Sequence, residues 1–173
     1  NFGAETAKLV GRAVAQHLNA QWVVVGYDSR ATSKDIANST VSGINLAGAR
    51  VLDIGLVGTE EVYWAVAHRR ACAGIMITAS HNPAEYNGMK IVKKNSLPLD
   101  PKTDLIEIKR IIEEGNWSRS SPESTRKNVS QSCRTNYVDK IWIRKGMCEK
   151  RKESLVIGSE SNMLIKAGRG LVG

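Results

Sequence analysis

The sequence predicts an α/β fold in which a layered, mixed but mostly parallel sheet is flanked by helices. Short apolar runs rich in β-branched residues alternate with segments whose apolar positions repeat at helical spacing. The chain has 173 residues, of which 42% are hydrophobic, so it is long enough for one compact core. An Asn-Gly turn signal predicts that one strand runs antiparallel to the others.

The first third of the chain is predicted to begin with a helix, a strand and a second helix. Apolar positions repeat at helical spacing over 4–19, and a β-branched run over 22–25 predicts a buried strand. A loop over 26–30 follows this strand. Thr32 or Ser33 is then expected to cap the second helix, because both hydroxyls can accept from its free N–H groups.

Three further strands are predicted in the middle of the chain. Residues 50–54 form a short strand, and Thr59 is expected to cap a helix whose first turn is acidic. A third apolar run over 73–77 leads directly into a loop over 78–83, where a proline blocks continued sheet pairing. The Asn-Gly turn then precedes 89–92, whose alternating pattern predicts a half-buried strand.

The chain is predicted to divide into three parts. Pro101 is expected to start the last helix of a first domain that spans residues 1–117. Residues 118–153 are polar and basic with little periodicity apart from a helix-like piece around 137–143, which predicts a linker. Residues 154–173 resemble the incomplete start of a second α/β domain.

The net charge of +8 is concentrated in the C-terminal part of the sequence. Residues 1–117 hold 13 basic and 12 acidic side chains, whereas 118–173 hold 12 basic and 5 acidic ones. The first domain therefore has the charge balance of an ordinary globular domain. A nucleic-acid partner is disfavoured, because the four tryptophans are scattered rather than interleaved with the basic residues.

Composition also limits the cellular setting. Three cysteines without C-x-x-C spacing argue against a disulfide framework or a zinc ribbon, which favours a reducing compartment and predicts a cytoplasmic protein. The sequence contains no apolar run of membrane-spanning length and no secretory signal pattern, so no membrane partner is expected.

The loop after the third strand carries the residue types of a covalent group carrier. Ser80 lies beside His81, and Lys90 follows ten residues later. A serine hydroxyl is a weak nucleophile unless a neighbour takes its proton or a cation stabilises arriving negative charge, and these two side chains suit both tasks. The alternative is that Ser80 and Asn82 only form turn hydrogen bonds before a proline.

The run Thr78-Ala-Ser-His-Asn-Pro83, followed by Tyr86-Asn-Gly-Met-Lys90, resembles the phosphoserine loop of the α-D-phosphohexomutases. Gly26-Tyr-Asp-Ser-Arg30 is similar to that family's G-x-D-x-R segment, and residues 53–61 resemble the equivalent loop of its bacterial phosphomannomutases. The resemblance covers about residues 4–117, the first domain of the family, and implies the family's fold there.

The resemblance also implies an isomerase that moves phosphate between C6 and C1 of a hexose, such as mannose or glucose phosphate. Ser80 would carry the catalytic phosphate and reach Mg²⁺ through it, with a hexose 1,6-bisphosphate as activator and intermediate. Lys90 would be the general acid and base, and His81 would assist proton transfer or hold the loop. Thr78, Asn82 and Arg30 would support the loop or bind substrate, although Arg30 could instead form only a structural salt bridge.

Several motifs of the family are missing from these 173 residues. They lack the Asp-Gly-Asp-Gly-Asp-Arg metal loop, the sugar-reading Gly-Glu-x-Ser loop and the phosphate-binding Arg-x-Ser-x-Thr-Glu-Pro loop. Because positioning and electrostatic preorganisation supply most of the acceleration in phosphoryl transfer, we expect a truncated mutase of low activity. A non-catalytic module whose basic residues 118–173 bind anionic partners is the alternative, and a basic segment without a selected role is a third possibility.

Overall fold

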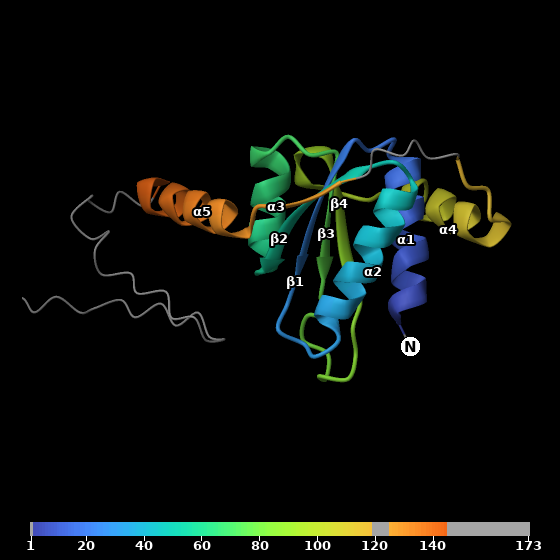
Figure 1. Ribbon diagram of the computed structural model, residues 1–173, viewed down its shortest axis with the longest axis horizontal. Coiled ribbons are helices and arrows are strands. Elements are labelled where there is room, and N and C mark those ends of the chain that lie inside the picture. The colour runs from blue at the N-terminus through green and yellow to red at the C-terminus, as the bar shows by residue number, and fades with distance from the viewer. Residues whose placement is uncertain (1, 119–124, 145–173) are drawn as a thin grey trace, which may run out of the picture.

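The computed structural model describes residues 2–118 and 125–144, without the side chains of 139–144. These residues form helices on both faces of one sheet (Figure 1). The elements in chain order are α1 (Ala4–His17), β1 (Trp22–Tyr27), α2 (Ser33–Leu46), β2 (Arg50–Leu56), α3 (Thr59–His68), β3 (Ala73–Ile77), β4 (Met89–Lys93), the 3-10 turn η1 (Lys94–Ser96), β5 (Leu97–Pro98), α4 (Asp104–Glu114), β6 (Arg126–Asn128) and α5 (Ser130–Arg144).

The sheet has the strand order β5-β4-β3-β1-β2-β6. Strand β1 pairs in parallel with β2 and β3, and β6 pairs in parallel with β2. Strand β4 is antiparallel to both β3 and β5. The predicted α/β class, with a mostly parallel sheet and one antiparallel strand after the Asn-Gly turn, is therefore confirmed.

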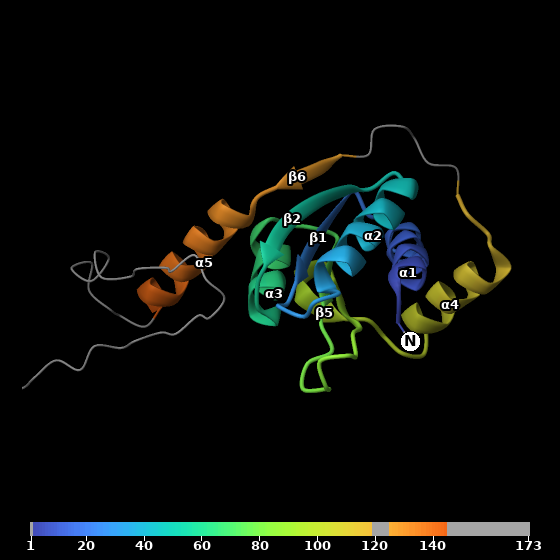
Figure 2. The same cartoon turned by 60° about the horizontal axis from the view of Figure 1, so that its bottom comes forward.

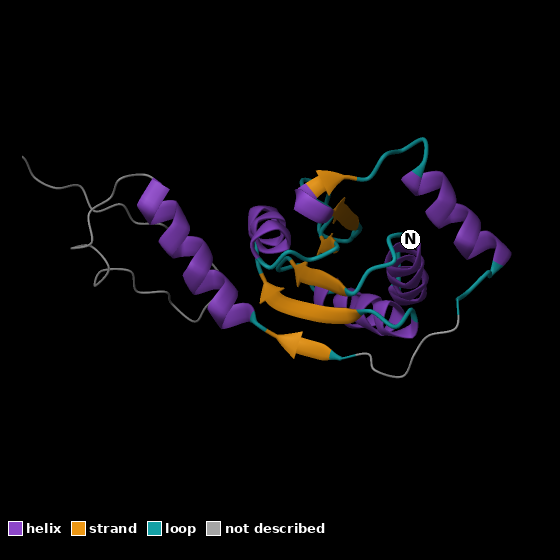
Figure 3. Ribbon diagram, turned by 90° about the horizontal axis from the view of Figure 1, so that it is seen from above, coloured by secondary structure: helices purple, strands orange, loops and turns teal. Residues whose placement is uncertain are grey.

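The core lies in two layers, one on each face of the sheet. Helices α1, α2 and α4 cover one face, and α3 with the start of α5 covers the other (Figures 2 and 3). All five residues of β3 are buried, as are the four central residues of β1, because both strands have helices on both sides. These central strands place their carboxyl ends, and the loops that follow them, at one edge of the sheet.

Helices α1 and α2 cross at close range because Gly43 has no side chain. A Cβ atom on Gly43 would lie 1.9 Å from the carbonyl oxygen of Lys8. Any larger residue would force the two helices apart, so this glycine fixes their separation. Since α2 begins beside the loop after β1, the packing also fixes the position of that loop.

Within the predicted linker the structure has a strand that the sequence did not indicate and a helix that includes the piece expected around 137–143. Strand β6 extends the sheet, and α5 follows it and points away from the sheet beyond its first turns (Figure 2). Asp53 of β2 is 6% exposed, and Arg126 of β6 lies 2.7 Å from its carboxylate, so the paired charge ties the strand to the sheet. All three residues of β6 are exposed, which explains why no apolar pattern marked it.

Two predicted helix starts were also wrong, one by a single residue and one by three residues. Helix α3 has Gly58 rather than Thr59 as its N-cap residue, and α4 begins at Asp104 rather than near Pro101. The Asp104 carboxylate accepts the backbone N–H of Asp100 at 2.7 Å, which holds the intervening residues in a turn. The strand predicted after residue 154 lies outside the described residues, so the division into three parts stays a prediction.

No helix in the described part of the chain is long and apolar enough to cross a membrane. Two of the three cysteines, Cys72 and Cys133, lie in this part, and both are free thiols.

Candidate functional site

The predicted phosphoserine loop joins β3 to β4 at the carboxyl end of the sheet. Thr78 and Ala79 are buried, and Ser80 is the first exposed residue after them. The Thr78 N–H donates to the carbonyl of Gly88 at 3.0 Å, which closes the base of the loop. The Ser80 N–H donates to the Thr78 hydroxyl oxygen at 2.9 Å. The hydroxyl of Ser80 is thus held on a rigid base and open to a ligand.

Ser80 adopts a left-handed backbone conformation, with φ of 56°. A non-glycine residue in this region costs on the order of 1–3 kcal/mol and persists only where its surroundings impose it. Two hydrogen bonds supply that restraint: the Ser80 N–H donates to the Thr78 hydroxyl oxygen, and the Ser80 carbonyl accepts from Arg30. Such local strain is more frequent at active sites and ligand clamps than elsewhere, which agrees with the predicted role of this residue.

Lys90 reaches Ser80 from the neighbouring antiparallel strand. In the register of β3 and β4, Lys90 lies opposite Met76, four residues before Ser80. Its Nζ atom lies 3.4 Å from the Ser80 Oγ atom. The structure therefore brings together the two residues that the sequence placed in one group, and it presents an ammonium group at the serine oxygen.

Arg30 holds the loop through four backbone carbonyls. Its terminal nitrogens donate to the carbonyls of Ser80 at 2.9 Å, Asn82 at 2.7 Å, Pro83 at 2.6 Å and Tyr86 at 3.1 Å. Its Nε atom pairs with Asp28 at 3.2 Å. The sequence offered two interpretations of Arg30, loop support and a structural salt bridge, and this side chain makes both kinds of contact. The planar guanidinium can make all these bonds because its five N–H donors point in fixed directions.

A second set of polar contacts, which sequence reasoning missed, lies behind the loop. Asn87 donates through Nδ2 to the hydroxyl oxygens of Ser33 at 2.9 Å and Thr32 at 3.0 Å. Ser33 in turn donates to Asp28. The predicted capping of α2 by one of these hydroxyls is wrong, since the helix start has no side-chain cap hydrogen bond. Both hydroxyl oxygens accept from Asn87 instead. Asn87 belongs to the Asn-Gly signal, which indicated only a turn.

His81 and Asn82 lie on the exposed outer part of the loop. Asn82 contributes its backbone carbonyl to Arg30, and its N–H donates to the carbonyl of Ala79 at 3.1 Å. Among the described residues, no hydrogen bond involves the His81 ring. The structure thus groups Ser80, Lys90 and Arg30 closely and leaves the His81 imidazole facing solvent, where an approaching ligand can reach it.

The described residues do not by themselves form a magnesium site. They contain no group of three or more His, Cys, Asp and Glu side chains that could hold a metal ion. Mg²⁺ requires about six oxygen ligands in octahedral geometry, and the loop carbonyls nearest Ser80 are already bonded to Arg30. The Ser80 oxygen remains as a candidate ligand.

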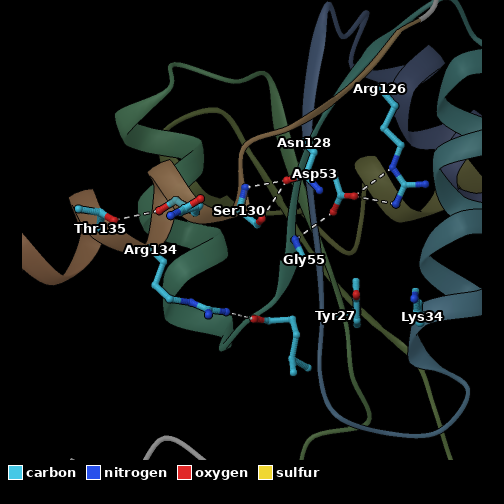
Figure 4. Close-up of a pocket in the computed structure, with 11 residues that line it drawn as sticks. Tyr27, Lys34, Asp53, Gly55, Arg126, Asn128, Ser130, Arg134 and Thr135 are labelled. Carbon is cyan, nitrogen blue, oxygen red and sulfur yellow. Dashed lines mark hydrogen bonds and ion pairs between the residues drawn. The ribbon is translucent and has the colours of Figure 1, made fainter. Parts of the chain in front are cut away.

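A pocket of about 620 Å³ lies at the carboxyl ends of β2 and β6 and is lined by no residue of the Ser80 loop (Figure 4). Its cations are largely occupied within the protein. Arg126 pairs with Asp53 at 2.7 Å, and Arg134 donates to the carbonyl of Leu56 at 2.7 Å. The lining residues are Tyr27, Lys34, Asp53, Gly55, Leu56, Arg126, Asn128, Ser130, Gln131, Arg134 and Thr135, none of which belongs to the predicted site. The concavity and the predicted chemistry therefore lie in different places.

Comparison with known proteins decides the family. The family model described as phosphoglucomutase/phosphomannomutase, alpha/beta/alpha domain I, matches residues 1–119. The chain belongs to the phosphoglucomutase/phosphomannomutase family. The resemblance stated from the Ser80 and Lys90 motifs is thereby confirmed, and the match covers the domain that contains both residues.

Relatives within this family include bacterial phosphomannomutases. A phosphomannomutase of Klebsiella pneumoniae is 41% identical over 135 residues, which cover 78% of this chain and 86% of that protein. A phosphomannomutase of Salmonella typhimurium is 40% identical over 133 residues, covering 76% of this chain and 29% of the relative. The chain therefore spans less than a third of the length of the Salmonella protein.

Solved structures of the family share the fold. A phosphoglucomutase/phosphomannomutase family protein from Burkholderia thailandensis superposes with a TM-score of 0.72 at 26% identity, covering 81% of this chain and 32% of that one. A phosphomannomutase-like protein from Thermus thermophilus superposes with a TM-score of 0.68 at 26% identity, covering 83% of this chain and 32% of that one. The sheet with its flanking helices thus corresponds to about one third of each structure.

Proposed function

We propose that this domain carries the phosphoryl group in a hexose phosphate isomerase. The reaction moves phosphate between C6 and C1 of mannose or glucose phosphate, and Ser80 is the intermediate carrier. The observation that carries the proposal is the pair formed by Ser80 and Lys90, with 3.4 Å between Oγ and Nζ, on a loop that Arg30 holds by four carbonyls. Family membership and relatives named phosphomannomutase support the same conclusion.

The proposed chemistry needs one proton at Ser80. When phosphoserine donates its phosphoryl group, the bond between phosphorus and Oγ breaks while a bond to a sugar hydroxyl oxygen forms. The Lys90 ammonium can give its proton to the departing Oγ and take it back when the serine is rephosphorylated. We propose that His81, exposed on the same loop, assists proton transfer at the sugar hydroxyl.

Arg30 positions the loop rather than the substrate. Its guanidinium donors go to loop carbonyls and to Asp28, while its positive charge remains beside a phosphate of about −1.5 to −2 on Ser80. Thr78 contributes by fixing the Ser80 N–H, and Asn82 by its carbonyl. Because these residues already hold the loop, its backbone needs to rearrange less when Ser80 is phosphorylated.

Mg²⁺ and a hexose 1,6-bisphosphate are the proposed cofactors, with a phosphorylated hexose as the substrate in the cytoplasm. When bound, Mg²⁺ neutralises charge on the transferring phosphoryl group. The 173 residues lack the metal, sugar and phosphate loops of the family, so we propose that this chain alone turns over slowly.

The alternative of an anion-binding module in residues 118–173 has less support. The described basic side chains of that segment are Arg126, Lys127 and Arg134, and two of them are bonded to Asp53 and to a backbone carbonyl. A cation that is already paired contributes less to binding a new anion.

A coupled phosphomannomutase assay tests the proposed function. The chain is assayed with mannose 1-phosphate, glucose 1,6-bisphosphate and Mg²⁺, beside Ser80→Ala and the control Ser42→Ala. Among the described residues, the Ser42 hydroxyl donates only to the carbonyl of Asn38 on α2. We expect slow turnover that Ser80→Ala abolishes and Ser42→Ala leaves unchanged. Turnover that survives Ser80→Ala would overturn the assignment of Ser80.

A further inference from the structure

We propose that Asn87 is a positioning residue that fixes Lys90 against Ser80, and that it acts through Ser33 and Asp28. The inference rests on the proposed function of Ser80 as the phosphoryl carrier, and it assigns the side chain of Asn87 a role beyond its turn.

Asn87 uses both ends of its amide where the loop returns to β4. Its Nδ2 group donates to the hydroxyl oxygens of Ser33 and Thr32, and its Oδ1 atom accepts the N–H of Gly88 at 2.9 Å. The carbonyl of Gly88 accepts the Thr78 N–H that closes the loop base. Asn87 therefore holds the Gly88 peptide, which is hydrogen-bonded to the end of β3 and precedes the start of β4. Asn87 itself lies three residues before Lys90 in the chain.

The other end of this chain of contacts is the carboxylate of Asp28. Ser33 is fully buried, and its hydroxyl donates to Asp28, so its oxygen is left to accept from Asn87. Asp28 also accepts the backbone N–H of Arg30 at 3.1 Å and its Nε at 3.2 Å. The Asp28 carboxylate thus orients both Arg30, which holds the outer part of the loop, and Ser33, which holds Asn87 where the loop joins β4.

The pair at the site is sensitive to small shifts. The 3.4 Å separation of Lys90 and Ser80 lies at the long end of the hydrogen-bond range, so a displacement of a few tenths of an ångström would lose the contact. Removal of the Asn87 amide releases the Gly88 N–H and leaves the Ser33 oxygen without its donor. We expect β4 to start in a less defined position as a result, which moves Lys90 from Ser80 without unfolding the core.

The test uses the chain with phosphoserine incorporated at position 80 by genetic code expansion. Phosphorus NMR over a pH series gives the second pKa of the phosphate, which is about 6 in a free phosphoserine. A nearby ammonium favours the dianion and lowers this pKa. The titration needs neither turnover nor Mg²⁺, and it reports how close Lys90 lies to the phosphate.

Four variants are compared with the parent chain. Lys90→Ala is expected to raise the phosphate pKa by about 0.6, the effect of one charge at about 5 Å in water. Asn87→Ala and Ser33→Ala are each expected to raise it by about 0.1, the effect of moving that charge from about 5 Å to about 6 Å from the phosphate. The control Asn116→Ala is expected to leave it unchanged, because Asn116 is exposed and uses only its backbone carbonyl, with Gln16. Amide NMR spectra of β1 and β3 confirm that each variant is folded.

The outcomes separate the two claims. If Lys90→Ala raises the pKa while Asn87→Ala and Ser33→Ala behave like the parent, the positioning role of Asn87 is overturned and the proposed function stands. If Lys90→Ala has no effect, Lys90 does not act on the phosphate, which overturns the proposed Ser80 and Lys90 pair and the positioning role with it.

Discussion

Removal of the Arg30 side chain is expected to destabilise the Ser80 loop more than any other single change there. Arg30→Ala deletes hydrogen bonds to four loop carbonyls and the pair with Asp28. The side chain of Arg30 is only 13% exposed, so water replaces these bonds poorly. A hydrogen bond from a charged donor contributes about 1.5–3 kcal/mol, and non-additivity within one network reduces the sum. We expect a loss of about 3 kcal/mol in the free energy of unfolding.

Urea denaturation followed by far-UV circular dichroism measures this loss. The matched control is Arg110→Ala, which removes an arginine that pairs with Glu107 and Glu114 on α4 but is 46% exposed. Exposed pairs of this kind contribute about 1 kcal/mol or less. Arg30→Lys should cost most of the same free energy of unfolding as Arg30→Ala, because an ammonium cannot reproduce the planar set of guanidinium donors. An Arg30→Ala cost no larger than that of Arg110→Ala would refute the argument that the guanidinium holds the loop.

Three further changes test the core. Hydrogen bonds from His17 and Lys93 lower the pKa of buried Asp104. The ionised carboxylate therefore stabilises the folded state above about pH 4, and this contribution is lost as the pH falls toward the folded-state pKa. In urea melts, Asp104→Asn should cost about 3 kcal/mol at pH 6 and progressively less below pH 4. Burial raises the pKa of Glu61, so folding disfavours its ionised form, and Glu61→Gln should raise the unfolding free energy at pH 7 but not at pH 4. Gly43→Ala should cost about 2–3 kcal/mol in thermal melts, whereas Gly3→Ala, with nothing within 4 Å of the added Cβ, should cost under about 1 kcal/mol. An unfolding free energy of the Asp104 or Glu61 variant equal to that of the parent across the stated pH range would contradict the argument for that residue. Equal stabilities of the two glycine variants would contradict the argument for Gly43.

Much of the fold was predictable because burial leaves a pattern in the sequence. Strands β1 and β3 are buried on both faces and consist of continuous apolar runs, which identified them without ambiguity. Both polar loops follow such strands, so the geometry of parallel sheets already placed Arg30 and Ser80 at one edge. The motif grouped Lys90 with Ser80, and the antiparallel pairing of β3 with β4 brings the two side chains together in the structure.

The parts that sequence reasoning missed are polar and carry no periodic signal. Strand β6 is exposed at all three residues and is held by Arg126 on the buried Asp53, a pairing between residues 73 positions apart. The contact of Asn87 with Ser33 spans 54 positions, and each residue separately matches a commoner local role, as a turn or a helix cap. Long-range pairs of polar side chains are specified by the folded backbone, so they become visible only when the elements are assembled.

Peptide mapping of the phosphorylated chain tests the central claim most directly. The chain is incubated with glucose 1,6-bisphosphate and Mg²⁺, digested, and analysed by tandem mass spectrometry beside the Ser80→Ala and Ser42→Ala variants. The account predicts a single phosphorylated position at Ser80, present in the parent and in Ser42→Ala and absent from Ser80→Ala. Phosphate on another residue, with labelling unchanged in Ser80→Ala, would contradict it.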